Sequence, residues 1–201
     1  MSEELSGVGH PSQRKVLWIV LALNVAIAAG FFATGLLGDS SALIANGLDN
    51  SSDAIVYAIS LMALGRPPRW KRIAARFSGI MLLAFAVGVM FDAGRRYLMG
   101  SEPIGATMMI MALVAAVVNL ASLFLLKRLR GKDVNLRAAT TFSLNDLISN
   151  GGILIGGGIV LWTGQNWPDL VVGIGIAAIA IYGGIDILRD THCEAKRAKE
   201  E

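Results

Sequence analysis

The sequence is poor in charged residues and in the side chains that most often bind metals or form disulfide bonds. Of its 201 residues, 16% are charged, two are histidine and one is cysteine. The single cysteine, Cys193, excludes an intramolecular disulfide bond. The histidines, His10 and His192, lie near the ends of the chain, so a site in its apolar part would have to use other ligands.

Long apolar runs take the place of the missing charge. Six runs approach or exceed the length of about 20 residues that a helix needs to cross a bilayer: 16–37, 40–65, 73–100, 103–126, 136–163 and 168–188. A soluble helical protein with a buried core would not repeat this pattern. The first run is longer than the core of a signal peptide, which has about 7–15 residues, so we expect it to be retained. We predict an all-α membrane protein with six transmembrane helices.

The basic residues are distributed unequally between the two sides that six spans create. Of the 18 Lys and Arg residues, only Arg95 and Arg96 fall on one side. Because cytoplasmic loops carry the excess of Lys and Arg, we expect both termini in the cytoplasm. The net charge of +3 follows from this topology, and no basic patch interleaved with aromatic residues indicates a nucleic-acid partner. The expected parts are a disordered N-terminus (1–13), a six-helix transmembrane domain (14–190) and a short tail (191–201).

Carboxylates occur inside two of the apolar runs. Asp49 and Asp53 are four residues apart in the second run and share a helix face, which Asn46 joins. Asp146 lies in the middle of the fifth run, on one face with Asn150. Each carboxylate at a bilayer centre costs about 2.5–3.5 kcal/mol on insertion scales. Since neither run has a basic residue beside these acids, the missing partner is expected to be a cation.

The three acids are expected at similar depth. With a rise of 1.5 Å per residue, Asp49 and Asp53 lie roughly 13–19 Å from the outer end of their helix, and Asp146 lies roughly 15 Å from the inner end of its own. In a core about 30 Å thick, all three are near the midplane, where carriers hold their substrates. Their oxygens suit a divalent cation. A further ligand could be water or one of four side chains: Asn46, Ser143, Asn145 and Asn150. Alternatively, the acids are protonated and only bridge helices.

Several motifs carry a family resemblance. The second run contains SSALIANGLDNSSD (40–53), and the fifth contains FSLNDLISN (142–150). The typical motifs of the cation diffusion facilitator family are S-x-x-L-L-A-D-x-x-[HD]-x-x-x-D and [HD]-x-x-x-D-x-x-x-[SN]. The chain resembles this family of divalent-metal/proton antiporters over roughly residues 14–190. Further similar positions are Glu102-Pro103-Ile104, Asn119 and Trp167-Pro168-Asp169.

The resemblance implies a cation-efflux-type bundle in a bacterial inner membrane. It implies a secondary transporter, not an enzyme, that exports Zn²⁺ (or Cd²⁺, Fe²⁺, Mn²⁺ or Co²⁺) from the cytoplasm against protons by alternating access, with no cofactor. Asp49, Asp53 and Asp146 match three of the four metal-ligand positions, while Phe142 fills the fourth and offers no ligand atom. Most members add a cytoplasmic domain that dimerises. Because this chain stops before that domain, we expect a homodimer held by transmembrane helices.

Two other functions compete with transport. The first is a non-transporting partner subunit of a complete metal transporter, because Phe142 leaves the site short of one ligand. The second is an intramembrane aspartyl protease, which also places two acids in the membrane. Such enzymes carry their acids in Tyr-Asp and Gly-x-Gly-Asp contexts, and neither context occurs in this sequence. The sequence therefore favours a transporter.

Overall fold

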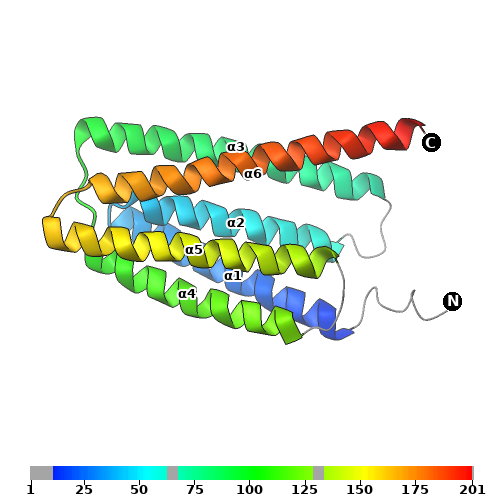
Figure 1. Ribbon diagram of the computed structural model, residues 1–201, viewed down its shortest axis with the longest axis horizontal. Helices are drawn as coiled ribbons and strands as arrows, with labels where there is room; N and C mark the ends of the chain where they lie inside the picture. Colours follow the sequence, from blue (N-terminus) through cyan, green and yellow to red (C-terminus); the bar gives the residue numbers. More distant parts are fainter. Residues whose placement is uncertain (1–10, 63–67, 129–133, 201) are drawn as a thin grey trace.

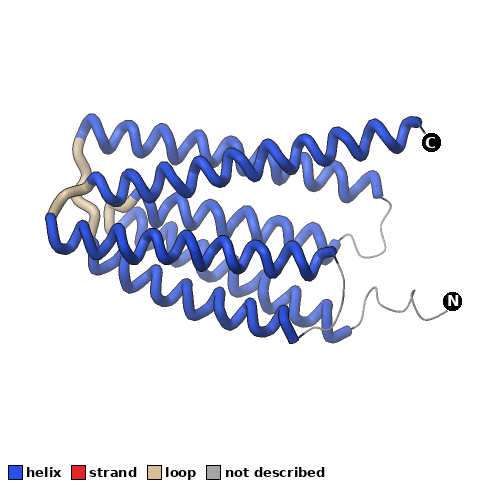
Figure 2. The backbone as a smooth tube through the Cα atoms, in the orientation of Figure 1, coloured by secondary structure: helices blue, strands red, loops and turns tan. Residues whose placement is uncertain are grey.

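Helices form nearly all of the described chain. The computed structural model describes residues 11–62, 68–128 and 134–200. These residues contain six α-helices and no strand (Figures 1 and 2), which confirms the predicted all-α class. The helices are α1 (Pro11–Leu37), α2 (Ser41–Met62), α3 (Pro68–Met99), α4 (Gly105–Arg128), α5 (Val134–Thr163) and α6 (Trp167–Glu200).

The ends of the first and last helices differ from the predicted runs. α1 begins at Pro11, so residues 11–13 are helical and do not belong to a disordered N-terminus. α6 continues beyond the apolar run to Glu200 and includes most of the expected tail. Extending an existing helix requires no new nucleation, and the Ala, Lys, Arg and Glu residues of this stretch favour helix. The hydropathy pattern therefore predicted the apolar part of α6 correctly but not the residue at which the helix ends.

Four of the helices are long and apolar enough to cross a membrane by themselves. They are α1, α4, α5 and α6, with candidate spans at 14–37, 105–127, 146–163 and 167–192. Within the described residues, α2 and α3 do not meet this combined condition of length and composition. α2 carries Asp49 and Asp53 with a polar stretch around them, and α3 is polar at both ends. Both helices pack in the same bundle as the four apolar spans (Figure 1).

The helices run antiparallel in three closely packed pairs: α1 with α2, α3 with α6, and α4 with α5. Besides its partner α1, α2 packs against α3 and α6 of the second pair and against α5 of the third. The connections after α1, α3 and α5 gather at one end of the bundle, called here the turn end. The first turn of α1 and the last turn of α6 lie at the opposite end, called here the terminal end (Figure 1).

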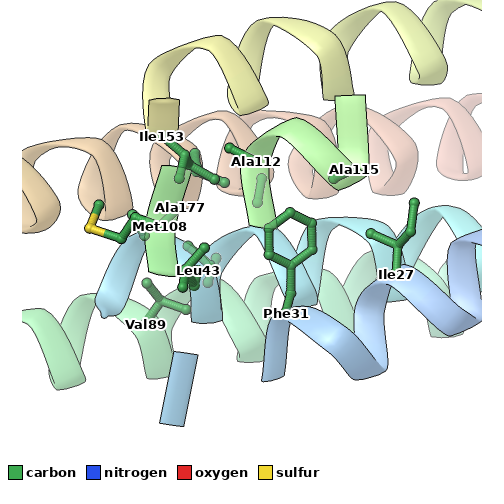
Figure 3. Close-up of a cluster of buried hydrophobic side chains, with 14 of the residues drawn as sticks. Ile27, Phe31, Leu43, Val89, Met108, Ala112, Ala115, Ile153 and Ala177 are labelled. Atoms are coloured by element: carbon green, nitrogen blue, oxygen red, sulfur yellow. The ribbon is translucent and has the colours of Figure 1, made fainter. Parts of the chain in front are cut away.

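Apolar side chains fill the bundle toward the turn end. Phe31, Leu43 and Met108 are fully buried there, between α1, α2 and α4. They belong to one cluster that also draws residues from α3, α5 and α6, including Val89, Ile153 and Ala177 (Figure 3). All of these residues lie within about ten positions of the turn end of their helices. A second, smaller apolar cluster of Val20, Tyr57 and Leu126 is buried toward the terminal end.

Candidate metal site

The three acids predicted from the sequence line one cavity. Its volume is about 200 Å³, and it lies between α2, α3, α5 and α6. α2 contributes Asp49, Ser52, Asp53 and Val56, and α5 contributes Asp146, Ile148 and Ser149. The opposite wall is apolar and consists of Leu82 from α3 with Ile179, Ala180, Gly183 and Ile187 from α6. One face of the cavity is thus acidic, and the other offers no polar side chain.

The acids are buried without a basic partner. Asp146 and Asp53 expose only 2% and 7% of their surfaces, and Asp49 is half-buried. No Lys, Arg or His is among the described residues that line the cavity. The ion pairs formed by the described residues do not involve these three acids. Because buried charges are costly unless they are compensated, the cavity favours a bound cation or protons.

Two of the weaker candidates, Asn46 and Asn150, are hydrogen-bonded to each other. Asn46 of α2 donates a hydrogen bond of 2.8 Å from Nδ2 to Oδ1 of Asn150 on α5. Both amides are buried, and Asn46 Oδ1 and Asn150 Nδ2 have no hydrogen-bond partner in the described part of the chain. Neither residue is among those that line the cavity. The side chains of Asn145, Ser143 and Phe142 lie outside the described residues.

The acids share the cavity without converging on one point. Among the described residues, no group of three or more His, Cys, Asp and Glu side chains is arranged so that it could hold a metal ion. Since a water molecule occupies about 30 Å³ in the liquid, the cavity has room for an ion that keeps several waters. Direct coordination by all three carboxylates would require the side chains or their helices to approach one another.

The structure adds lining residues that the sequence did not single out. Ser52 and Ser149 follow Asp49 and Asp146 by three residues, so helical spacing could have identified them. The apolar wall from α6 left no comparable signal. A side chain that faces lipid and one that faces this cavity are both apolar, so the sequence of α6 does not separate them.

The comparison with known families decides the identity of the fold. The family model described as the cation efflux transmembrane domain matches residues 17–192. The chain belongs to the cation efflux family. Its helices therefore form a cation efflux transmembrane domain, as the motifs in α2 and α5 predicted. The match, the apolar helices and the mostly bacterial relatives support a multi-pass protein of a bacterial inner membrane.

Curated relatives of this family member include bacterial metal transporters. The metal cation efflux system protein CzcD of Cupriavidus metallidurans is 26% identical in an alignment of 195 positions that covers 90% of this chain and 60% of CzcD. The zinc transporter ZitB of Escherichia coli is 27% identical in an alignment of 182 positions that covers 82% of this chain and 58% of ZitB. A Bacillus velezensis relative, named as a cadmium, cobalt and zinc/H(+)-K(+) antiporter, is 20% identical over 196 residues. The chain thus spans about 60% of the length of the relatives it matches.

Proposed function

We propose that this cation efflux protein is a secondary transporter that exports a divalent metal from the cytoplasm in exchange for protons. The observation that carries the proposal is that Asp49, Asp53 and Asp146 line one cavity whose described lining residues include no Lys, Arg or His. A carboxylate binds either a metal ion or a proton. Metal binding therefore releases protons, and the same three groups couple the two fluxes.

Asp49, Asp53 and Asp146 are the proposed metal ligands. Asn46, Asn145 and Asn150 are weaker candidates. Asn46 and Asn150 would have to give up their mutual hydrogen bond, or approach through their free amide atoms, to take part. The bound ion keeps waters in the remaining positions, in keeping with the size of the cavity.

Zn²⁺ is the proposed substrate, with Cd²⁺, Co²⁺, Fe²⁺ and Mn²⁺ as alternatives. The names of the relatives support zinc first, since ZitB is named as a zinc transporter and the Bacillus velezensis relative is named for cadmium, cobalt and zinc. The described lining provides carboxylate and hydroxyl oxygens, with no nitrogen or sulfur ligand. Such a set also accepts harder ions such as Mn²⁺.

The terminal end of the bundle is proposed to face the cytoplasm. The excess of Lys and Arg residues belongs to the connections and chain ends on that side. Phe31, Leu43 and Met108 of the apolar cluster lie nearer the turn end than the three acids, which supports a conformation that is closed on that side. Alternating access would require this cluster to part while the terminal side closes.

A homodimer through transmembrane helices is a further part of the proposal, and α3 is the proposed contact. Ala84 and Gly88 are exposed on the bundle surface, and a Cβ added at Gly88 would meet nothing within 4 Å. Their spacing of four residues places both on one helix face. Small residues at this spacing allow two membrane helices to approach closely.

The test is transport by the purified protein in liposomes. We expect Zn²⁺ to accumulate when an outward proton gradient is imposed, and protons to move when Zn²⁺ is added. Metal binding without flux would instead favour a partner subunit that needs a complete transporter. The absence of both binding and flux for all five metals would contradict the proposed function.

A further inference from the structure

The first turn of α2 is capped by a side chain from α6. Asp169 Oδ2 accepts a hydrogen bond of 2.7 Å from the backbone N–H of Ser41, and Asp169 Oδ1 accepts one of 3.2 Å from the N–H of Ala42. The Ser40 hydroxyl donates to Asp169 Oδ1 and accepts from the N–H of Leu43 at 3.1 Å. The free N–H groups at this helix start are therefore satisfied jointly by Ser40 and by a carboxylate 128 residues away.

Asp169 is well suited to hold two helices together. It lies in the first turn of α6 and is fully buried, so its carboxylate sits at the positive ends of α6 and α2 at the same time. Hydrogen bonds to an ionised acceptor are about twice as strong as those between neutral groups. The ion pairs formed by the described residues leave Asp169 out, so its polar contacts are with Ser40, Ser41 and Ala42.

The two helices joined at Asp169 line opposite walls of the cavity. Both run from this joint toward the terminal end (Figure 1). Asp49 lies eight residues after Ser41, about 12 Å along α2, and Ile179 lies ten residues after Asp169, about 15 Å along α6. One helical turn after Asp169 along α6, a Cβ added at Gly173 would lie 3.0 Å from the backbone carbonyl carbon of Ser41. α2 and α6 are thus joined by the Asp169 side chain, approach each other closely at Gly173 and both line the cavity farther along.

A second contact ties α3 to the same place. The buried Arg96 of α3 pairs with Asp39, the residue before Ser40, and is held by Asp92 through Nε at 2.6 Å. The helices that supply the apolar wall of the cavity, α3 and α6, are therefore both fastened to residues 39–42. These residues lead into the helix that carries Asp49 and Asp53.

We propose that Asp169 is a positioning residue for transport, which sets the apolar wall of α6 against the acidic wall of α2. The inference rests on the proposed function. Asp169 is not among the residues that line the acidic cavity, and the helices that carry the acids, α2 and α5, are joined independently by the bond between Asn46 and Asn150. Loss of the joint should therefore leave metal affinity nearly unchanged, while the α6 wall loses its fixed register and transport slows.

The experiment compares Asp169→Asn with Asp186→Asn in the full chain. Asn keeps the size of the side chain but brings an NH₂ group toward the N–H groups of Ser41 and Ala42. Asp186 lies on the same helix, is exposed and does not line the cavity, so it is a matched control. Spin labels at Met62→Cys and Tyr182→Cys, in a Cys193→Ser background, report the α2–α6 distance from exposed positions outside the cavity.

We expect Asp169→Asn to broaden the metal-free distance distribution and to lower the maximal Zn²⁺ flux by about tenfold or more. The Zn²⁺ dissociation constant should stay within about threefold of that of the parent protein. Asp186→Asn should match the parent in all three measurements. A narrow, parent-like distribution with parent-like flux in Asp169→Asn would overturn the inference, and so would an equal effect in the control.

Two further results keep the inference open to refutation. If Asp169→Asn fails to insert, Ser40→Ala takes its place, because it retains the carboxylate, removes one of the three hydrogen bonds that Asp169 accepts and leaves the N–H of Leu43 without its cap. A parent-like distribution in Ser40→Ala would then refute the inference. If the parent protein neither binds nor transports metal, the proposed function is wrong. This outcome depends only on the parent protein, so it is distinct from a failure of the inference about Asp169.

Discussion

Asn46 of α2 and Asn150 of α5 are joined by a buried hydrogen bond of 2.8 Å. The two helices are antiparallel. Asp49 lies three residues after Asn46 in α2, and Asp146 lies four residues before Asn150 in α5, so both acids are about one helical turn from the bond toward the terminal end. The bond therefore brings the acids of the two helices to the same level. It gives a physical reason why acids about 100 residues apart in sequence line one cavity.

Removing either partner of this bond should destabilise the protein. Asn46→Leu or Asn150→Leu leaves the other amide buried without its partner, which costs about 1–3 kcal/mol. The double variant should lose less than the sum of the single variants, because neither amide is then left unpaired. Unfolding in mild detergent measures all three free energies of unfolding. Additive losses would show that the bond does not couple α2 to α5.

Replacing any of the three acids should abolish metal transport without preventing folding. Asp49→Asn, Asp53→Asn and Asp146→Asn each remove one charged ligand but also relieve the cost of a buried carboxylate. Residues that only hydrogen-bond to a metal ligand are already worth about 10–100-fold in metal affinity, so loss of a direct ligand should cost at least as much. Zn²⁺ flux and calorimetric binding provide the measurements, with Asp186→Asn as the control. Parent-like transport in one variant would remove that residue from the site.

Apparent metal affinity should fall as pH falls. Zn²⁺ binds the deprotonated carboxylates of the cavity, and protons compete for the same oxygens. Acidification shifts these groups toward their protonated form, so more Zn²⁺ is needed for half-saturation. Binding titrations from pH 8 down to pH 5 test the sign of the effect. An affinity that does not change over this range would argue against direct competition between metal and protons.

Close packing of α4 against α5 should make one glycine sensitive to a single methyl group. A Cβ at Gly157 would lie 2.9 Å from Met108 Cβ and 3.0 Å from the carbonyl oxygen of Gly105, whereas a Cβ at Gly158 would meet nothing within 4 Å. Gly157→Ala should destabilise the fold by about 1–3 kcal/mol through overpacking. Gly158→Ala should stabilise it by about 0.5–1 kcal/mol because Ala restricts the unfolded chain. Similar thermal shifts in the two variants would contradict this packing.

The sequence was informative where polar residues interrupt apolar runs, and much less so elsewhere. Asp49, Asp53 and Asp146 stood out because lipid-exposed carboxylates are costly, and a constant helical rise predicted their common depth. The apolar wall around Ala180 could not be predicted, since cavity and lipid select the same side chains. The contact of Asp169 with Ser41 was hidden for another reason. It depends on the meeting of two helix starts that are distant in sequence.

Assembly through α3 can be tested with single cysteines in native membranes. The exposed face that carries Ala84 and Gly88 allows close approach of a second α3, whereas the buried face around Ala86 and Val89 packs inside the bundle. In a Cys193→Ser background, Ala84→Cys and Gly88→Cys should therefore form disulfide-linked dimers, and Ala86→Cys should not. Because membrane helices associate without a hydrophobic driving force between them, detergent should weaken the contact, and crosslinking should be stronger in membranes than in micelles. If no position along α3 crosslinks while transport persists, the transporting unit is a monomer or uses another helix.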